Sequence, residues 1–133
     1  MSPEKEQAIF QRWPDWFRTA HDVRLSGMSD GFRCDDGWYD IIYELFERLE
    51  PLVAKLDESG PSFEVIQVKE KFGTLRFYAN RRNDEIEAAI GSARELSRRT
   101  CELCGNTGSL EEHDDGLWKT LCSSCRDSAQ WWR

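Results

Sequence analysis

Four cysteines near the C-terminal end constrain the fold of this chain more than any other feature. Cys101 and Cys104 form one C-x-x-C pair, Cys122 and Cys125 form a second, and residues 105–121 separate the pairs. This spacing is typical of a zinc site with four thiolate ligands. Four protein ligands fill the coordination sphere, so we expect a structural rather than a catalytic ion. Disulfides are the weaker explanation, because the polar, acidic start of the chain is unlike a secretory signal.

The residues around the cysteines predict a small metal-dependent module over residues 101–133. Gly105 suits a tight turn that points backbone N–H groups at sulfur, and residues 126–132 can form a terminal helix. Together these features predict a zinc-ribbon or treble-clef-like arrangement. The segment has few apolar residues, so we expect it to lose its shape without metal. The fifth cysteine, Cys34, reads as a small, partly buried apolar residue, with a reactive thiol or an intermolecular metal ligand as alternatives.

Hydrophobic periodicity predicts helices in the first half of the chain. Ile9, Trp13 and Trp16 have helical spacing within residues 3–19, where Pro14 should end or restart the helix. A wide apolar stripe predicts a second helix over residues 38–57.

Capping residues and helix-breaking residues indicate where these helices should begin, bend or end. Asp36 is a candidate N-cap for the second helix, and Pro51 should bend or split it. Asn83-Asp84 caps a third helix over roughly residues 84–99, in which Gly91 either weakens the helix or permits a close approach. The predicted inner stripe of the third helix is Ile86, Ala89, Ile90, Ala93 and Leu96.

Residues 63–79 predict a β-hairpin between the second and third helices. Both arms are rich in β-branched and aromatic residues, and the turn lies near Glu70–Gly73, where glycine can adopt a positive φ. Two strands alone are marginally stable, so the hairpin must pack on helices or join further strands. The predicted fold is therefore α+β: helices on a β-hairpin or small antiparallel sheet over residues 1–100, with the zinc module of residues 101–133 packed on it.

Charge is unevenly distributed along the 133 residues. The chain carries 18 Lys and Arg against 25 Asp and Glu, a net charge of -7, but residues 67–100 alone have an excess of cations. A zinc ion bound by four thiolates would add further negative charge. Long duplex DNA is therefore a poor partner, whereas a small anionic ligand or a basic protein remains compatible with this charge pattern.

Cations and aromatic residues alternate on the predicted hairpin. The cations are Lys69, Lys71 and Arg76, with Arg81 and Arg82 at the hairpin exit, and the aromatics are Phe72, Phe77 and Tyr78. Such a pattern can hold a phosphate and stack a base, which suits a nucleotide or a short single strand. The candidate ligand-binding residues are Lys69, Lys71, Arg76 and Tyr78. The alternative is that these cations form salt bridges with the acidic flanks and that Phe72 and Phe77 lie in the core.

Two other features, the acidic stretch around His113 and the terminal tryptophan pair, could have a function. His113 lies in the acidic stretch Glu111–Asp115, which could bind a second metal as in HNH nucleases, although their upstream histidine and later histidine have no counterpart here. The alternative is a solvated acidic loop. The adjacent Trp131 and Trp132 cannot both face one core, which suggests a homodimer or partner surface.

Several segments together resemble a family of small, functionally uncharacterised zinc-knuckle proteins from bacteria, prophages and phages. The resemblance covers about residues 36–125, and its most specific part is the K-E-K-F-G-x-L-R-F-Y segment. The other segments are Gly37–Ile42, Cys101–Gly105 and Thr120–Cys122. The family implies no established activity, but its phage setting suggests an accessory role in countering host defence.

The leading hypothesis is a non-catalytic binding protein that contains structural zinc and sequesters a phosphate-bearing nucleotide. The alternatives are a module that inhibits a host protein through protein–protein contact and a metal-dependent nuclease that uses His113. No stretch of the sequence approaches the length of an apolar membrane span, and we expect a cytoplasmic protein.

Overall fold

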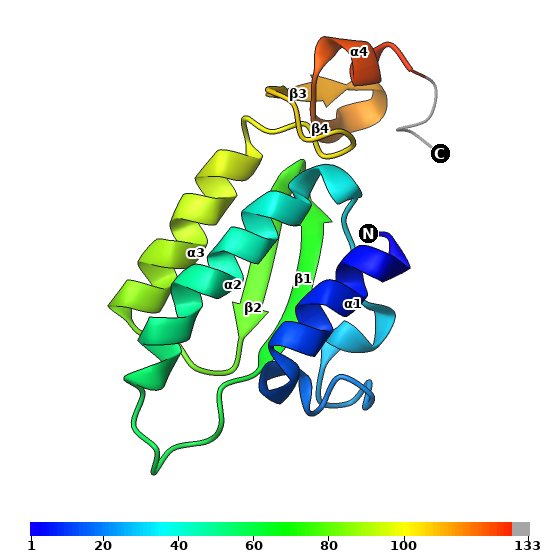
Figure 1. Ribbon diagram of the computed structural model, residues 1–133. Helices are drawn as coiled ribbons and strands as arrows, with labels where there is room; N and C mark the ends of the chain where they lie inside the picture. The colour runs from blue at the N-terminus through cyan, green and yellow to red at the C-terminus, as the bar shows by residue number, and fades with distance from the viewer. Residues whose placement is uncertain (129–133) are drawn as a thin grey trace.

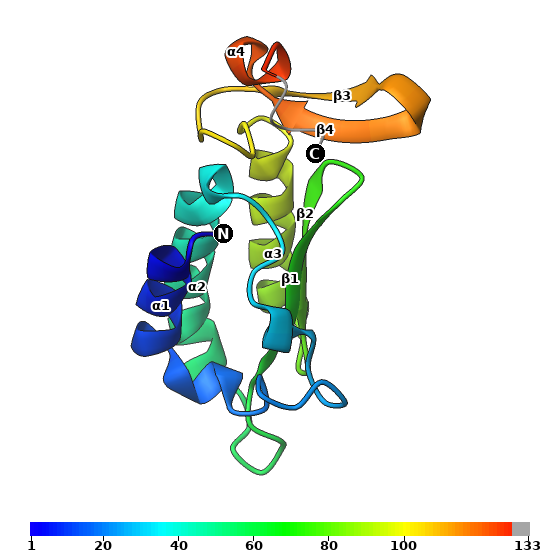
Figure 2. The same cartoon turned by 90° about the vertical axis from the view of Figure 1, so that its right-hand side faces the viewer.

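The computed structural model describes residues 1–128, apart from the side chain of Asp115, and shows an α+β fold. Within this range the chain forms four α-helices and two separate two-stranded antiparallel sheets. In Figure 1, helix α2 lies between α1 and α3, and the hairpin β1–β2 packs behind them. The second hairpin, β3–β4, sits at one end of this assembly (Figures 1 and 2). No helix of the described residues is both long and apolar enough to cross a membrane.

The N-terminal helix ends where its proline predicts. Helix α1 spans Pro3–Arg12, and a separate 3₁₀ turn spans Pro14–Phe17. Proline cannot donate to the helical hydrogen-bond ladder, so the chain turns at Trp13. Ile9 and Trp13 are both buried, which anchors the helix and the break on the core.

Helix α2 spans Tyr39–Ala54 rather than the predicted residues 38–57, and five of its residues are buried in the core. Asp36 does not cap it; the Asp36 carboxylate accepts a hydrogen bond from the Ser2 N–H at 2.7 Å and so ties down the chain start. Pro51 does not split the helix, because Leu52 and Val53 beyond it still pack on the core. The ring of Phe46 contacts five other aromatic rings, those of Trp13, Trp16, Phe17, Phe32 and Phe77.

The predicted hairpin is confirmed, with strands β1, Val65–Lys71, and β2, Thr74–Ala79. Phe72 and Gly73 form its two-residue turn with φ values of +53° and +80°, the sign that a type I′ turn requires at both positions. Val68 pairs with Phe77, and both face the helices. Residues of the neighbouring pairs, such as Lys69 and Arg76, point to the opposite side.

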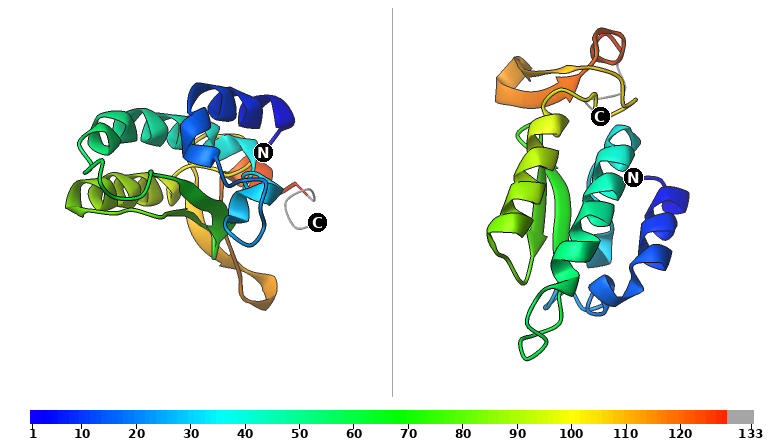
Figure 3. Two further views of the ribbon diagram at one scale, coloured as in Figure 1. Left: turned by 90° about the horizontal axis from the view of Figure 1, so that it is seen from below. Right: turned by 60° about the vertical axis from the view of Figure 1, so that its left-hand side comes forward.

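Helix α3, Asp84–Ser97, is capped by Asn83, whose side chain accepts from the Ile86 N–H at 2.9 Å. The predicted inner stripe is correct except at its end, where Leu96 is 40% exposed and Ser97 is buried instead. The Ser97 hydroxyl accepts from the Leu75 N–H at 3.0 Å, which satisfies the open edge of β2. Figure 3 shows α3 running alongside the hairpin. The hairpin therefore has α-helices on one face; among the described residues no α-helix covers the other face, although the 3₁₀ turn Gly27–Asp30 packs against β1 (Figure 2).

The C-terminal residues form strands β3, Ser109–His113, and β4, Leu117–Leu121, followed by the short helix α4, Ser123–Arg126. The acidic stretch is thus a strand and a 3₁₀ turn, Asp114–Gly116, rather than a loop. The helix also begins earlier than predicted, between the two cysteines of the second pair. The structure ends this helix at Arg126, so the prediction is wrong at Asp127 and Ser128. The rest of the predicted helix, with Trp131 and Trp132, lies outside the described residues.

Backbone contacts join the β3–β4 segment to the helices and the first hairpin. The Gly37 N–H donates to the Glu102 carbonyl at 2.7 Å, and the Trp38 indole N–H donates to the Thr100 carbonyl at 2.8 Å. A Cβ atom on Gly37 would lie 2.2 Å from the carbonyl oxygen of Cys101, so only glycine fits this approach. Thr120 also donates from its hydroxyl to the Gly73 carbonyl at 2.7 Å.

Gly37→Ala is expected to lower the free energy of unfolding by about 1–3 kcal/mol, because the added methyl group must displace the backbone of Cys101 and Glu102. Gly91→Ala is the matched control: a Cβ there meets no atom within 4 Å, and alanine in a helix interior should stabilise by up to about 1 kcal/mol. Urea unfolding of both variants measures the difference. Equal stability of the two variants would contradict the close approach at Gly37.

Candidate functional site

The four predicted metal ligands converge at the end of the molecule. Cys101 and Cys104 lie in the turn after α3, where Gly105 adopts a φ of +83° and donates to the Cys101 carbonyl at 2.9 Å. Cys122 is the N-cap of α4, and Cys125 lies within that helix. All four Sγ atoms lie within 4.8 Å of one another, although 17 residues, 105–121, separate the two pairs in the chain.

The geometry and chemistry of this cluster fit a metal ion. The Sγ atoms of Cys104 and Cys122 are 3.6 Å apart, close to the edge of about 3.8 Å that a tetrahedron with zinc–sulfur bonds of about 2.3 Å requires. All five cysteines are free thiols, so no disulfide accounts for the convergence. The N–H of Cys125 donates to the Cys122 Sγ at 3.4 Å and lowers the pKa of that thiol to about 7, which favours the thiolate that a metal binds. These four residues could therefore hold a metal ion.

Cys34 is not part of this cluster. Its side chain is 6% exposed and packs in the core, and burial raises the pKa of its thiol to about 12. The prediction of a small buried residue is confirmed, and a thiol with so high a pKa is a poor nucleophile.

His113 lies on β3 opposite Leu117, while His21 lies far away beside the N-terminal 3₁₀ turn. Glu111, on the same strand, forms an ion pair with Arg126 at 3.5 Å. Among the side chains that the structure describes, which do not include that of Asp115, the only group of three or more placed to bind one metal is the four cysteines. The described side chains therefore form no second metal site around His113.

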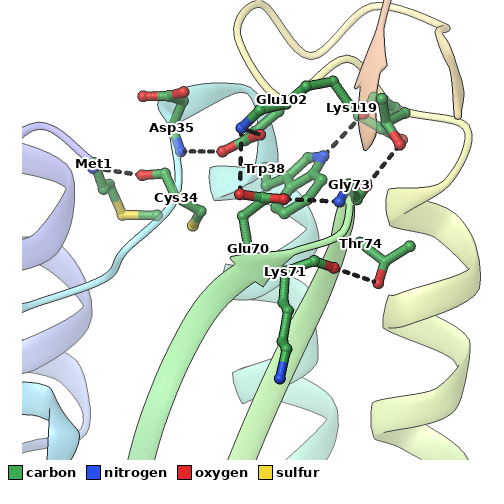
Figure 4. Close-up of polar contacts among 12 residues, drawn as sticks. Met1, Cys34, Asp35, Trp38, Glu70, Lys71, Gly73, Thr74, Glu102 and Lys119 are labelled. Carbon is green, nitrogen blue, oxygen red and sulfur yellow. Dashed lines mark hydrogen bonds and ion pairs between the residues drawn. The ribbon is translucent and has the colours of Figure 1, made fainter. Parts of the chain in front are cut away.

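A charge cluster formed by the buried Glu102 and the partly buried Lys119 and Glu70 joins the cysteine module to the first hairpin (Figure 4). The Lys119 ammonium lies 3.2 Å from a Glu70 carboxylate oxygen and 3.5 Å from a Glu102 carboxylate oxygen. The second oxygen of Glu70 accepts from the Gly73 N–H at 2.7 Å, and that of Glu102 accepts from the Asp35 N–H at 3.1 Å. Burial raises the pKa of Glu102 to about 7, against the opposing effect of the nearby Lys119.

Sequence reasoning missed this cluster, although one signal was present. Glu70 follows Val68 by two positions, and alternate residues of a strand share a face. A carboxylate at an inward position needs a buried partner, but periodicity cannot say which distant residue supplies it.

The segments that carry the family resemblance meet at this junction. Gly37 contacts Glu102, Glu70 and Gly73 contact Lys119 and Thr120, and the first cysteine pair lies alongside. The residues of these segments therefore serve a common structural purpose, because they hold the cysteine module against the hairpin turn.

The four candidate ligand-binding residues share the hairpin face opposite the helices, which we call the outer face and define by Gln67, Lys69, Lys71, Thr74, Arg76 and Tyr78. This face is only partly open, because Thr74 is 3% exposed and Gln67 lies against Gly27. Lys69 pairs with Arg76, and Tyr78 pairs with Gln67, so these side chains point to one side. Within residues 1–128, none of Lys69, Lys71 and Arg76 forms a salt bridge. The Arg76 Nε is buried and has no hydrogen-bond partner there.

The salt-bridge alternative for this region is partly wrong. Phe77 lies in the core as that alternative expected, but Phe72 is 63% exposed. The two arginines at the hairpin exit are engaged elsewhere: Arg81 donates to the carbonyls of Asp57 and Pro61, and Arg82 forms an ion pair with Glu87 at 3.0 Å.

No protein-family model matches this chain, and no curated protein or solved structure is significantly similar to it. The resemblance over residues 36–125 therefore stays a prediction, and the geometry of the two sites is the basis for functional inference.

Lys119→Ala is expected to lower the free energy of unfolding by about 3 kcal/mol at pH 8, because it leaves a buried carboxylate without its cation. Glu102 has a raised pKa, so it is mostly protonated in the folded protein at pH 6 and the loss should be smaller there. Lys55→Ala is the control, since the exposed pair Lys55–Glu85 at 3.9 Å should contribute within about 0.5 kcal/mol. Urea unfolding at both pH values tests this; equal losses at pH 6 and pH 8 would contradict it.

Proposed function

We propose that this protein is a non-catalytic binding protein in which a structural zinc ion holds the C-terminal module and the outer face binds a phosphate-bearing nucleotide. One observation carries the proposal. Three cations lie on one strand-paired face with an aromatic ring and have no carboxylate partner among the side chains that the structure describes. In the accessory role that the resemblance implies, such a protein would sequester its ligand.

Zinc is the metal that the donor set favours, because four thiolates in a tetrahedral arrangement are the usual ligands of a structural zinc ion. Cys101, Cys104, Cys122 and Cys125 would hold it and leave no open coordination position. When bound, the ion would cross-link the turn after α3 to the start of α4. Between residues 101 and 128 only four residues are buried, Cys101, Glu102, Thr120 and Leu121, so the module has little core of its own and should depend on the metal.

The outer face suits a phosphate because none of the described carboxylates pairs with its cations. Glu70, the carboxylate between Lys69 and Lys71 in sequence, points to the opposite side and is held by Lys119. Figure 4 shows the Lys71 side chain extending away from the Glu70 carboxylate. A phosphate on this face would meet the ammonium groups and the guanidinium of Arg76, which is suited to bidentate contact with its oxygens. Tyr78 offers a ring for stacking a base, and Gln67 opposite it offers an amide.

The overall charge limits which phosphate-bearing ligands fit. With a net charge of -7, the chain repels a long polyanion except at this face. A short or small ligand meets the local cations without approaching the acidic surfaces. The nuclease alternative requires a second cluster of metal-ligating side chains, and none is present in the part of the chain that the structure describes.

Native mass spectrometry of protein purified without chelator is expected to show one zinc ion per chain. Cys104→Ala should lose the ion and lower the thermal stability, because three thiolates leave the coordination incomplete. Cys34→Ala is the matched cysteine control and should keep the ion, since Cys34 lies in the core away from the cluster. Wild-type protein without metal, or loss of zinc in Cys34→Ala, would overturn the assignment.

Reversing two charges of the outer face in Lys69→Glu/Lys71→Glu should weaken binding of ATP, used as a probe phosphate ligand, roughly 10- to 30-fold. Each exposed ion pair contributes up to about 1 kcal/mol, and reversal adds repulsion. Lys55→Glu/Arg98→Glu makes the same charge change at exposed cations of the helices and should leave binding nearly unchanged. Isothermal titration calorimetry measures both, and an equal loss in both variants would show that only net charge matters.

A further inference from the structure

Phe72 occupies a position that suits an aromatic residue poorly. It is the first central residue of a type I′ turn and is the only non-glycine residue in the described chain with a positive φ, at +53°. Such turns favour asparagine or aspartate before glycine, because bulky side chains clash with the backbone at positive φ. The turn therefore carries strain that an Asn-Gly sequence would avoid.

The Phe72 ring gains little from its own chain in return. It is 63% exposed, and the Lys71 ammonium lies 5.6 Å from the ring centroid. The positive φ costs conformational energy that the exposed ring does not recover by packing, and an observed backbone outlier of this kind motivates a hypothesis of function at Phe72.

A second exposed aromatic residue, Trp118, lies in the strand whose backbone touches the hairpin turn. A Cβ on Gly73 would lie 3.0 Å from the Lys119 backbone nitrogen, so the two backbones touch, and Phe72 and Trp118 are the residues that precede them. Trp118 is 39% exposed and Leu117 beside it is 41% exposed. The Thr120–Gly73 hydrogen bond and the Lys119–Glu70 ion pair hold the two hairpins together here. The turn that carries Phe72 is therefore held at a fixed junction, at one end of the outer face.

We infer that the ligand of the outer face is a short single strand of nucleic acid, with a base stacked on Phe72 and phosphates held by Lys69, Lys71 and Arg76. This inference rests on the proposed function and specifies its ligand. Cations beside exposed rings are the arrangement by which proteins bind single strands without reading their sequence.

The extent of the face favours a strand over a mononucleotide. Thr74 and Tyr78 are four residues apart on β2, about 13 Å at the rise of a strand, and Phe72 lies beyond Thr74 at the tip. One base cannot stack on both Phe72 and Tyr78, whereas successive bases of a strand can. A duplex keeps its bases stacked on one another, so it could use the cations but not the rings.

Phe72→Asn separates binding from folding, because it installs the preferred turn residue and removes the ring. The variant should keep zinc and unfold at a temperature equal to or higher than wild type. Its affinity for fluorescein-labelled dT12, measured by anisotropy, should fall roughly five- to 150-fold, the range for losing one stacked base. Leu96→Asn, which removes an exposed apolar side chain from α3, should leave that affinity unchanged.

Further binding measurements show whether the single-strand ligand or the phosphate site itself is wrong if the affinities differ from those expected. Wild-type protein should bind dT12 or rU12 more tightly than dTMP, and the two oligomers distinguish a DNA from an RNA preference. Three phosphate contacts predict that log K falls with log salt at a slope of about −2. If dTMP and ATP bind through Lys69 and Lys71 but the oligomers bind no more tightly, or if Phe72→Asn binds dT12 as wild type does, the strand is wrong and the phosphate site survives. If neither mononucleotide nor oligomer binds, the proposed function itself fails, and the exposed rings are left to a protein partner.

Discussion

The ammonium of Lys119 connects the two parts of this protein. It comes from the strand that leads to Cys122 and lies between Glu70 of the hairpin and the buried Glu102 beside Cys101. A buried carboxylate is costly unless a cation and hydrogen-bond donors accompany it, and here the donors are the backbone N–H groups of Gly73 and Asp35. The cluster therefore fixes the hairpin turn, the loop before α2 and the cysteine module relative to one another.

This junction also determines which side chains of the outer face and of the turn are left unpaired or exposed to solvent. Because Glu70 turns inward to Lys119, it leaves Lys69 and Lys71 without the carboxylate that their sequence neighbourhood suggests. The module contacts the turn through Gly73 and leaves the ring of Phe72 in solvent. A residue that costs stability at a rigid junction is consistent with a contact surface, since stability and function commonly conflict at such positions.

The metal cluster and the outer face have separate roles in this scheme. Four thiolates that complete a coordination sphere leave no position for a substrate, so the metal would act through folding alone. The cations and rings would supply the binding. Because the cysteine module positions Trp118 and supports the turn, loss of metal should disturb both the module and the face that depends on it.

The sequence by itself determined the types of the first three helices and of the first hairpin, and the candidate ligands of a metal, but not the strands β3 and β4. Periodicity, the break at Pro14, the cap at Asn83 and the glycine turn are local signals, and cysteine spacing is read directly from the chain. Only the tertiary structure decided that Asp36 binds Ser2 instead of capping a helix, that Glu70 pairs with Lys119, and that Phe72 is exposed rather than in the core. These outcomes depend on residues far apart in the sequence, and whether a charge is paired or a ring is covered is decided by what packs against it.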